Sequence, residues 1–160
     1  MVLNILLIII AFAGMEAVAW FTHRYVMHGF MWFLHRDHHQ KHKGFFEWND
    51  LFVVMFAIPS WLNIMYGMMH GYDFKFYIGV GIALYGIAYF LVHEIIIHQR
   101  VKLPVKNTNP YVIAMRKAHK VHHSYTNKAP GDNFGFVFLI PWKYFSDAWK
   151  EAATSQSKIS

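Results

Sequence analysis

Residues 2–21 read VLNILLIIIAFAGMEAVAWF, and residues 22–39 read THRYVMHGFMWFLHRDHH. The first stretch is long and apolar enough to cross a bilayer as a helix, which takes ~20 mostly apolar residues. The second stretch contains five histidines. An apolar helix that ends in a histidine-rich segment therefore decides how the rest of the chain is interpreted.

The composition of the whole chain is typical of a membrane protein. Of its 160 residues, 56% are hydrophobic, 19% are aromatic and 15% are charged, whereas a soluble domain has ~25% charged residues. The formal net charge of +6 favours attraction to anionic lipid headgroups over nucleic-acid binding. Nothing in the sequence resembles a linker, so we expect a single membrane-embedded domain over residues 1–160.

Three apolar stretches are expected to span the membrane: Val2–Phe21, Leu51–Met69 and Phe76–Ile97. Only residues 70–75 join the last two, which leaves room for a tight antiparallel helical hairpin. The fold class predicted is therefore all-α, an integral membrane helical bundle. The shorter apolar piece Phe134–Trp142 contains Pro141; it favours an interfacial or re-entrant segment, and a fourth, tilted span stays open.

Ten of the twelve histidines follow one spacing rule twice, H-x4-H and then H-x2-H-H. The first copy holds His23, His28, His35, His38 and His39, and the second holds His93, His98, His119, His122 and His123. Imidazole is the commonest metal ligand in proteins, and no folding requirement explains the repeat. We predict that these ten side chains hold two metal ions in one site.

The helical positions of these histidines suggest how each motif binds. In a regular α-helix His35, His38 and His39 span an arc of about 100°, so their rings can converge on one cavity. The pairs His23/His28 and His93/His98 would diverge by about 140°, which suits a helix end or a site held from two sides. The latter pair resembles the H-E-x-x-H motif of zinc proteases, but it has one residue too many.

The basic residues predict how the chain is oriented. Fourteen of the fifteen Lys and Arg residues lie after the first or the third span, and only Lys75 lies on the opposite face. The positive-inside rule places the first group in the cytoplasm. All ten repeated histidines lie at that end of the spans, so we expect them to meet on the cytoplasmic side of a bacterial inner membrane.

A buried carboxylate is expected to orient one of the metal-bound imidazoles. Glu16 lies seven residues before His23, on nearly the same helical face and inside a span, where an unpaired charge is costly. We therefore favour Glu16 as the partner of a ligand, with a water-lined surface or a helix–helix contact as the alternative. Weaker candidates are Glu94, Asp37 and Asp132, and two histidines, His42 and His70, fall outside the repeat.

Electrons for any redox chemistry must come from another protein. The chain has no cysteine, hence no thiolate ligand or iron–sulfur cluster, and it has no dinucleotide-binding or haem motif. A ferredoxin-like donor with its reductase is implied. Such donors are usually acidic, so the basic residues could steer one or merely satisfy the positive-inside rule. These residues are Lys102, Lys106, Arg116, Lys117 and Lys120.

Several motifs together resemble one family. In the first half these are Gly14-Met15-Glu16, the run from His23 to Gly29 and the run from Phe46 to Leu51. In the second half these are Tyr85-Gly86, Tyr89-Phe90, Val92-His93-Glu94, His98-Gln99-Arg100, Ala118-His119, His122-His123 and Phe134-Gly135-Phe136. In this order they resemble the bacterial beta-carotene hydroxylases of the fatty acid hydroxylase superfamily. The resemblance covers roughly residues 14–142, and residues 151–160 carry no match.

The resemblance implies a non-haem diiron monooxygenase that uses O2 to hydroxylate carbon 3 of a beta-ionone ring. Beta-carotene would thereby become zeaxanthin by way of beta-cryptoxanthin. The ten histidines would be the iron ligands, with no catalytic residue beyond them, and Zn could occupy the site as a substitute. Phe12, Trp20, Phe21, Tyr89 and Phe90 lie near the depth at which a polyene would bind, but core packing or interfacial anchoring explains them better, so none is assigned as a binding residue.

Two other functions stay open. The first is a fatty acid or sterol hydroxylase or desaturase of the same superfamily, with a similar metal site and a different substrate channel. The second is a membrane metal carrier or sensor without enzymatic activity. A carrier needs polar ligands in the middle of the membrane, whereas these histidines gather at one end of the spans, which favours the enzyme.

Overall fold

The computed structural model describes residues 1–40, 44–102, 109–128 and 132–157, and in these residues all regular structure is helical. The helices are α1 (Val2–Phe21), η1 (Thr22–Phe30), α2 (Trp32–His35), η2 (Arg36–His39), α3 (Asp50–Met69), α4 (Phe74–Tyr89), η3 (Phe90–Ile97), α5 (Pro110–Ser124) and α6 (Trp142–Ser157). The predicted all-α class is confirmed.

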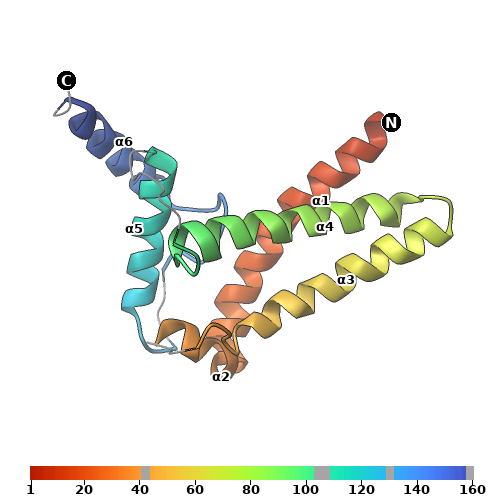
Figure 1. Ribbon diagram of the computed structural model, residues 1–160, viewed down its shortest axis with the longest axis horizontal. Helices are drawn as coiled ribbons and strands as arrows, with labels where there is room; N and C mark the ends of the chain where they lie inside the picture. Colours follow the sequence, from red (N-terminus) through yellow and green to blue (C-terminus); the bar gives the residue numbers. More distant parts are fainter. Residues whose placement is uncertain (41–43, 103–108, 129–131, 158–160) are drawn as a thin grey trace.

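Three continuous helical stretches are long and apolar enough to cross a membrane, as the sequence predicts. They run over Val2–Phe30, Asp50–Met69 and Phe74–Ile97, and few of their residues are buried inside the protein. In a bilayer, the apolar side chains exposed on these helices would face the hydrocarbon. Figure 1 shows α3 and α4 as an antiparallel hairpin, with α1 crossing α4.

Small residues let these helices approach closely. A Cβ atom at Gly79 of α4 would lie 2.8 Å from the carbonyl oxygen of Ser60 in α3, and one at Gly81 would lie 2.6 Å from the Cβ of Ala11 in α1. Membrane helices associate through such close backbone contact, because lipid gives no hydrophobic driving force. The two glycines thus hold α4 between its neighbours.

The remaining helices gather at the end of the bundle opposite the turn between α3 and α4 (Figure 1). There α5 packs on α6 through a small apolar core. This core consists of Ile113, Ala114, Ala118, Tyr144, Ala148 and Ala152. The histidines of both repeats lie at this end of the fold, on η1, α2, η2, η3 and α5 or directly after η3.

The apolar piece Phe134–Trp142 is not a fourth span. Its residues before Trp142, where α6 begins, form no helix. Its backbone lies against α1, because the Glu16 carboxylate accepts hydrogen bonds from the amides of residues 136–139 at 2.9–3.1 Å. These hydrogen bonds hold the segment against α1, and its interfacial or re-entrant place in the membrane stays a prediction.

Candidate metal centre

Two π-helical segments place each H-x4-H pair on one face. Both η1 and η3 are π-helices, and the amide of His98 donates to the carbonyl of His93 at 2.9 Å. A π-helix bonds residue i to i+5, so side chains five apart come together. Accordingly the rings of His23 and His28 lie 5.1 Å apart, and those of His93 and His98 lie 4.6 Å apart. The divergence of about 140° expected for regular α-helices does not occur.

Five buried histidines form the first cluster, with one ring nitrogen of each within 4.8 Å of the others. They are His23, His28, His35, His39 and His122. The Nε2 atom of His35 lies 3.2 Å from that of His23 and 3.1 Å from that of His39. The Nε2 atoms of His28 and His122 are 3.2 Å apart.

Four histidines form the second cluster by the same distance criterion: His38, His93, His98 and His119. Its shortest nitrogen–nitrogen distance is 2.8 Å, between the Nε2 atoms of His98 and His119. The ring of His123 borders this cluster, 4.3 Å from the ring of His119, and its buried Nε2 has no hydrogen-bond partner in the described structure. The two repeats therefore meet, as the topology predicts. His70 lies exposed at the opposite end of α3, and His42 lies outside the described residues.

The outer nitrogen of most of these rings donates a hydrogen bond to an oxygen. In the first cluster Nδ1 donates to the carbonyl oxygens of Phe134, Lys128, Tyr125 and Asp132 and to the side-chain oxygen of Asn49, at 2.7–3.3 Å. Carbonyl oxygens only accept, so Nδ1 carries the proton and Nε2 carries a lone pair. This is the tautomer and orientation that metal-bound histidines have.

The inward nitrogens need a cation between them. With the protons on Nδ1, the Nε2 atoms of His23, His35 and His39 point lone pairs at one another across 3.1–3.2 Å, so they cannot hydrogen-bond. Adjacent ligands with metal–nitrogen bonds of ~2.1 Å lie ~3 Å apart, which matches these distances. The donor set therefore fits a metal ion at the first cluster, and the buried, unpartnered Nε2 atoms of His38 and His93 extend the fit to the second.

Burial keeps His39, His98 and His122 neutral. It lowers the pKa of His39 to about 4 and the pKa values of His98 and His122 to about 3, mainly because the charged form would be desolvated. Neutral imidazole is the form that binds metals. Each of these three rings therefore has one nitrogen without a proton at physiological pH, which is available to a metal.

Carboxylates orient the second cluster, in contrast to the first. The Nδ1 atom of His38 donates to Glu47, and that of His93 donates to Glu94, each at 2.7 Å. Arg100 pairs with both carboxylates, at 3.1 Å to Glu47 and 2.7 Å to Glu94, and also with Asp50 at 2.9 Å. One guanidinium thus holds both of the carboxylates that orient this cluster.

The carboxylate of Glu16 holds a backbone segment, whereas the sequence favours it as the partner of a metal-binding histidine. Its fully buried carboxylate accepts from the amides of residues 136–139 and from the hydroxyl of Tyr85 at 2.7 Å, and no histidine is among these donors. A carboxylate inside a span needs several donors, and the turn of backbone at residues 136–139 supplies them. Glu16 thus fixes a segment that borders the histidines.

Of the three weaker carboxylate candidates, one orients a histidine through its side chain and two do not. Glu94 orients His93, whereas Asp37 accepts from the amide of Trp48 at 2.6 Å, and Asp132 contributes only its backbone oxygen, to His122. Sequence reasoning missed Glu47 and Asn49. Both lie in the run from Phe46 to Leu51 that carries part of the family resemblance, which was the one available signal.

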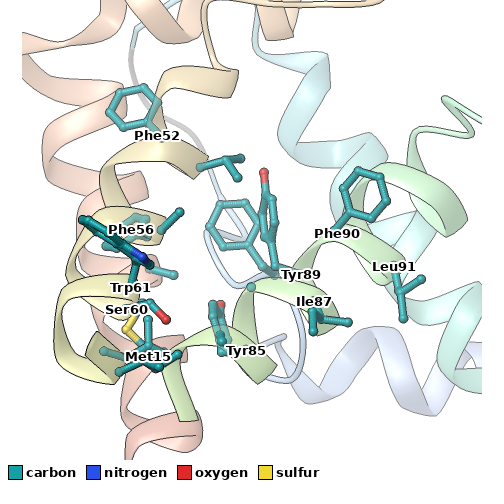
Figure 2. A pocket seen from close by; sticks show the side chains of 18 of the residues that line it. Met15, Phe52, Phe56, Ser60, Trp61, Tyr85, Ile87, Tyr89, Phe90 and Leu91 are labelled. Atoms are coloured by element: carbon teal, nitrogen blue, oxygen red, sulfur yellow. The ribbon is translucent and has the colours of Figure 1, made fainter. Parts of the chain in front are cut away.

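An apolar cavity of about 500 Å³ lies between α3 and α4, and two of its lining residues, Tyr89 and Phe136, stack on His93 and His23 of the clusters. Figure 2 shows Phe52, Phe56 and Trp61 of α3 on one side, and Tyr89 and Ile87 on the other. Of the aromatic residues placed near substrate depth by the sequence, Tyr89 and Phe90 line this cavity, while Phe12, Trp20 and Phe21 do not.

The basic residues considered as a docking surface for an electron donor are partly engaged within the protein. Arg116 donates to the carbonyl oxygen of Ile96 at 2.8 Å, and Lys117 pairs with Glu151. Lys102 and Lys120 are exposed, and Lys106 lies outside the described residues. Arg116 thus fastens α5 to η3 and is not part of a free basic surface.

Comparisons with known proteins agree with this geometry. The family model for fatty acid hydroxylase matches residues 8–147. The chain is 38% identical over 138 residues to a beta-carotene hydroxylase of Pseudescherichia vulneris and 37% identical over 138 residues to one of Pantoea ananas. Each alignment covers 86% of this chain and 78% of the relative. A beta-carotene hydroxylase of Paracoccus sp. is 30% identical over 139 residues, which is 86% of this chain and 85% of that protein.

No solved structure matches the chain significantly. The family model and the relatives nevertheless span both histidine repeats, the Glu47–Asn49 segment and the loop held by Glu16. The chain belongs to the fatty acid hydroxylase family, alongside the bacterial beta-carotene hydroxylases.

Proposed function

We propose that this protein is an O2-dependent diiron monooxygenase that hydroxylates carbon 3 of the beta-ionone rings of beta-carotene. Acting at both ends, it produces zeaxanthin by way of beta-cryptoxanthin. The observation that carries the proposal is the pair of histidine clusters beside an apolar cavity. The names of the relatives supply the substrate.

Iron fits the required chemistry better than zinc. The C–H bond of a hydrocarbon offers no acid or base site, so the reaction needs a redox-active metal, and Zn²⁺ has no redox chemistry. Imidazole suits iron, and ten histidines provide ligands for two ions. When bound, the iron pair supplies the electron transfer to O2 that makes one oxygen atom reactive toward a C–H bond.

The reaction balances only with an external reductant. The ring C–H bond, O2, two electrons and two protons give the ring C–OH bond and one water. No cysteine, flavin motif or haem motif in the sequence can supply the electrons, so we assign them to a ferredoxin-like donor and its reductase. The orientation predicted from the basic residues places the site on the cytoplasmic side of a bacterial inner membrane, where such donors are found.

The chain's own residues prepare the site for this chemistry. Phe134, Lys128, Tyr125 and Asp132 offer backbone oxygens, and Asn49 offers a side-chain oxygen, that keep the proton on Nδ1 and turn Nε2 inward. Apolar side chains line the neighbouring cavity and exclude water from the reacting carbon. The site is thereby set up before substrate arrives.

The polar groups of the cavity favour a hydrocarbon over a fatty acid or sterol. Ser60 donates its hydroxyl to Gly79, Tyr85 donates to Glu16, and Tyr89 donates to Glu94. The other polar group of the lining side chains is the indole N–H of Trp61, which is exposed. Among the described residues no charged side chain lines the cavity to hold a carboxylate, and a buried polar group without a partner is costly.

The test is pigment chromatography of beta-carotene-producing bacteria that express the chain. We expect zeaxanthin from the parent and from a His70→Ala control, whose histidine lies at the opposite end of the fold, and only beta-carotene from His119→Ala. Zeaxanthin from His119→Ala would contradict the proposed metal site. Unchanged beta-carotene with the parent present in the membrane would contradict the proposed substrate.

A further inference from the structure

One aromatic side chain stands between the apolar cavity and both histidine clusters. The ring of Phe136 stacks on His23 of the first cluster, with centroids 4.6 Å apart and an interplanar angle of 19°. It also meets the edge of His93 of the second cluster at 5.1 Å. Phe136 lines the cavity as well. Tyr89 also lines it and stacks on His93 at 4.8 Å, but Phe136 contacts both clusters.

The position of Phe136 is fixed by its backbone. Its amide donates to Glu16 at 3.0 Å, and its side chain is only 4% exposed. The preceding Gly135 permits the tight course of the loop, because a Cβ atom there would lie within 2 Å of the carbonyl oxygen of Leu139. A ring held in this way acts as a fixed wall and not as a mobile cover.

The cavity opens toward lipid and closes toward Phe136. Near its opening Trp61, Ile87 and Leu91 are each more than half exposed, whereas Tyr85 and Phe136 are buried. All three exposed residues belong to membrane-spanning helices. A membrane-dissolved polyene can thus enter between α3 and α4 with one ring leading, and its remaining length stays in the bilayer.

The position of the substrate ring relative to the oxidising centre decides which carbon is hydroxylated. Carbon 4 of a beta-ionone ring is allylic and has a weaker C–H bond than carbon 3, so an enzyme that oxidises carbon 3 must hold carbon 4 away from the oxidising centre. A misplacement of ~1 Å changes such reactions strongly.

We propose that Phe136 is the specificity-determining residue of this site, the wall that stops the leading ring with carbon 3 toward the clusters. This inference rests on the proposed function. The oxidation at carbon 4 has the same balance as at carbon 3: a C–H bond, O2, two electrons and two protons give a C–OH bond and water. Shortening Phe136 lets the ring advance or turn, and the allylic position becomes reachable.

The matched control is Phe138, two residues later in the same loop. Its amide also donates to Glu16, at 3.1 Å, but its side chain is exposed. Phe138 does not line the apolar cavity and instead faces a second, more polar hollow with Trp20 and Arg24. Truncating it removes a ring from the same loop without enlarging the space for substrate.

The experiment compares the parent with Phe136→Ala, Phe136→Leu and Phe138→Ala in beta-carotene-producing bacteria. Hydroxylated rings are separated by position, and iron is measured in each purified variant. We expect the ratio of 4-hydroxylated to 3-hydroxylated rings to rise about ten-fold or more in Phe136→Ala and less in Phe136→Leu. Phe138→Ala should keep the parent ratio, and iron content should match the parent in all variants.

Two results would overturn the inference. One is exclusive 3-hydroxylation by both Phe136 variants; the other is complete loss of hydroxylation by Phe136→Leu at full iron content, which would make the ring a requirement for reaction instead of a guide. Should Phe136→Ala fail to accumulate in the membrane, the Phe136→Leu ratio decides. A parent that hydroxylates no carotenoid would instead refute the proposed function itself.

Discussion

His38 and His122 occupy the same place in the two histidine repeats, and each lies in the cluster built mostly by the other repeat. His122 joins four histidines of the first repeat, and its Nε2 lies 3.2 Å from that of His28. His38 joins three histidines of the second, and its ring lies 4.3 Å from that of His98. Each candidate metal site thus requires both halves of the chain.

Because His38 and His122 each complete the cluster of the other repeat, an exchange between the two repeats, the metal content of single variants can be predicted. Loss of His122 should empty the first site, and loss of His38 should empty the second, because each removes a buried ligand of its cluster. We expect each alanine variant to retain about one of two iron ions per chain, by elemental analysis of purified protein. His70→Ala is the control, and two ions in both variants would contradict the exchange.

Asn49 should be needed for the first site although it is not a metal ligand. It accepts from Nδ1 of His35 at 2.7 Å and is buried. Loss of such an outer partner lowers metal affinity by about 10–100-fold, so Asn49→Ala should show that decrease in an iron competition titration. Asn63→Ala is the matched control, since its amide only donates to Pro59 on an exposed face. Equal affinity in the two variants would refute the role.

Arg100 should support the second site and leave the first unchanged. It pairs with Glu47 and Glu94, which orient His38 and His93. In Arg100→Gln the carboxylates lose their shared cation, and we expect weaker binding of one of two iron ions, seen as biphasic loss of iron during chelation. Lys75→Gln removes an ion pair at the α3–α4 turn, away from the histidines, and should leave one phase. Iron loss in a single phase from both variants would contradict the prediction that Arg100 supports only the second site.

Glu16→Gln should destabilise the protein. The carboxylate accepts from Tyr85 and from the amides of residues 136–139, and an amide would turn two N–H groups toward these donors. Hydrogen bonds to charged groups contribute about 1.5–3 kcal/mol each, so we expect a loss of about 2–4 kcal/mol in the free energy of unfolding, measured in detergent. Glu151→Gln on α6, half exposed, should lose under about 1 kcal/mol.

Removal of metal should destabilise the whole end of the fold that carries the histidines. Without a cation the lone pairs of His23, His35 and His39 face one another at 3.1–3.2 Å. Ligands that bind only the folded state add stability by mass action. We expect chelation to lower the melting temperature by roughly 5–10 °C and added Fe²⁺ to restore it. An unchanged melting temperature in fully iron-free protein would contradict structural metal binding.

Much of the fold could be predicted because it depends on local composition. The three spans and the hairpin between α3 and α4 follow from runs of apolar residues, whereas the sequence left a fourth span at residues 134–142 open. The π-helical course of η1 and η3 could not be predicted, since no residue type signals it. It arises where five-residue spacing must bring two side chains to one face.

The sequence by itself determined which ten histidines gather at one end of a helical membrane bundle, because spacing and hydrophobicity are properties of the chain. Only the tertiary structure decided how these histidines divide between the two clusters. The exchange of His38 and His122 depends on how α5 packs against the first repeat, and the oxygens that hold most rings of the first cluster belong to the backbone. Every residue has a carbonyl oxygen, so folding alone selects the ones that point toward a histidine.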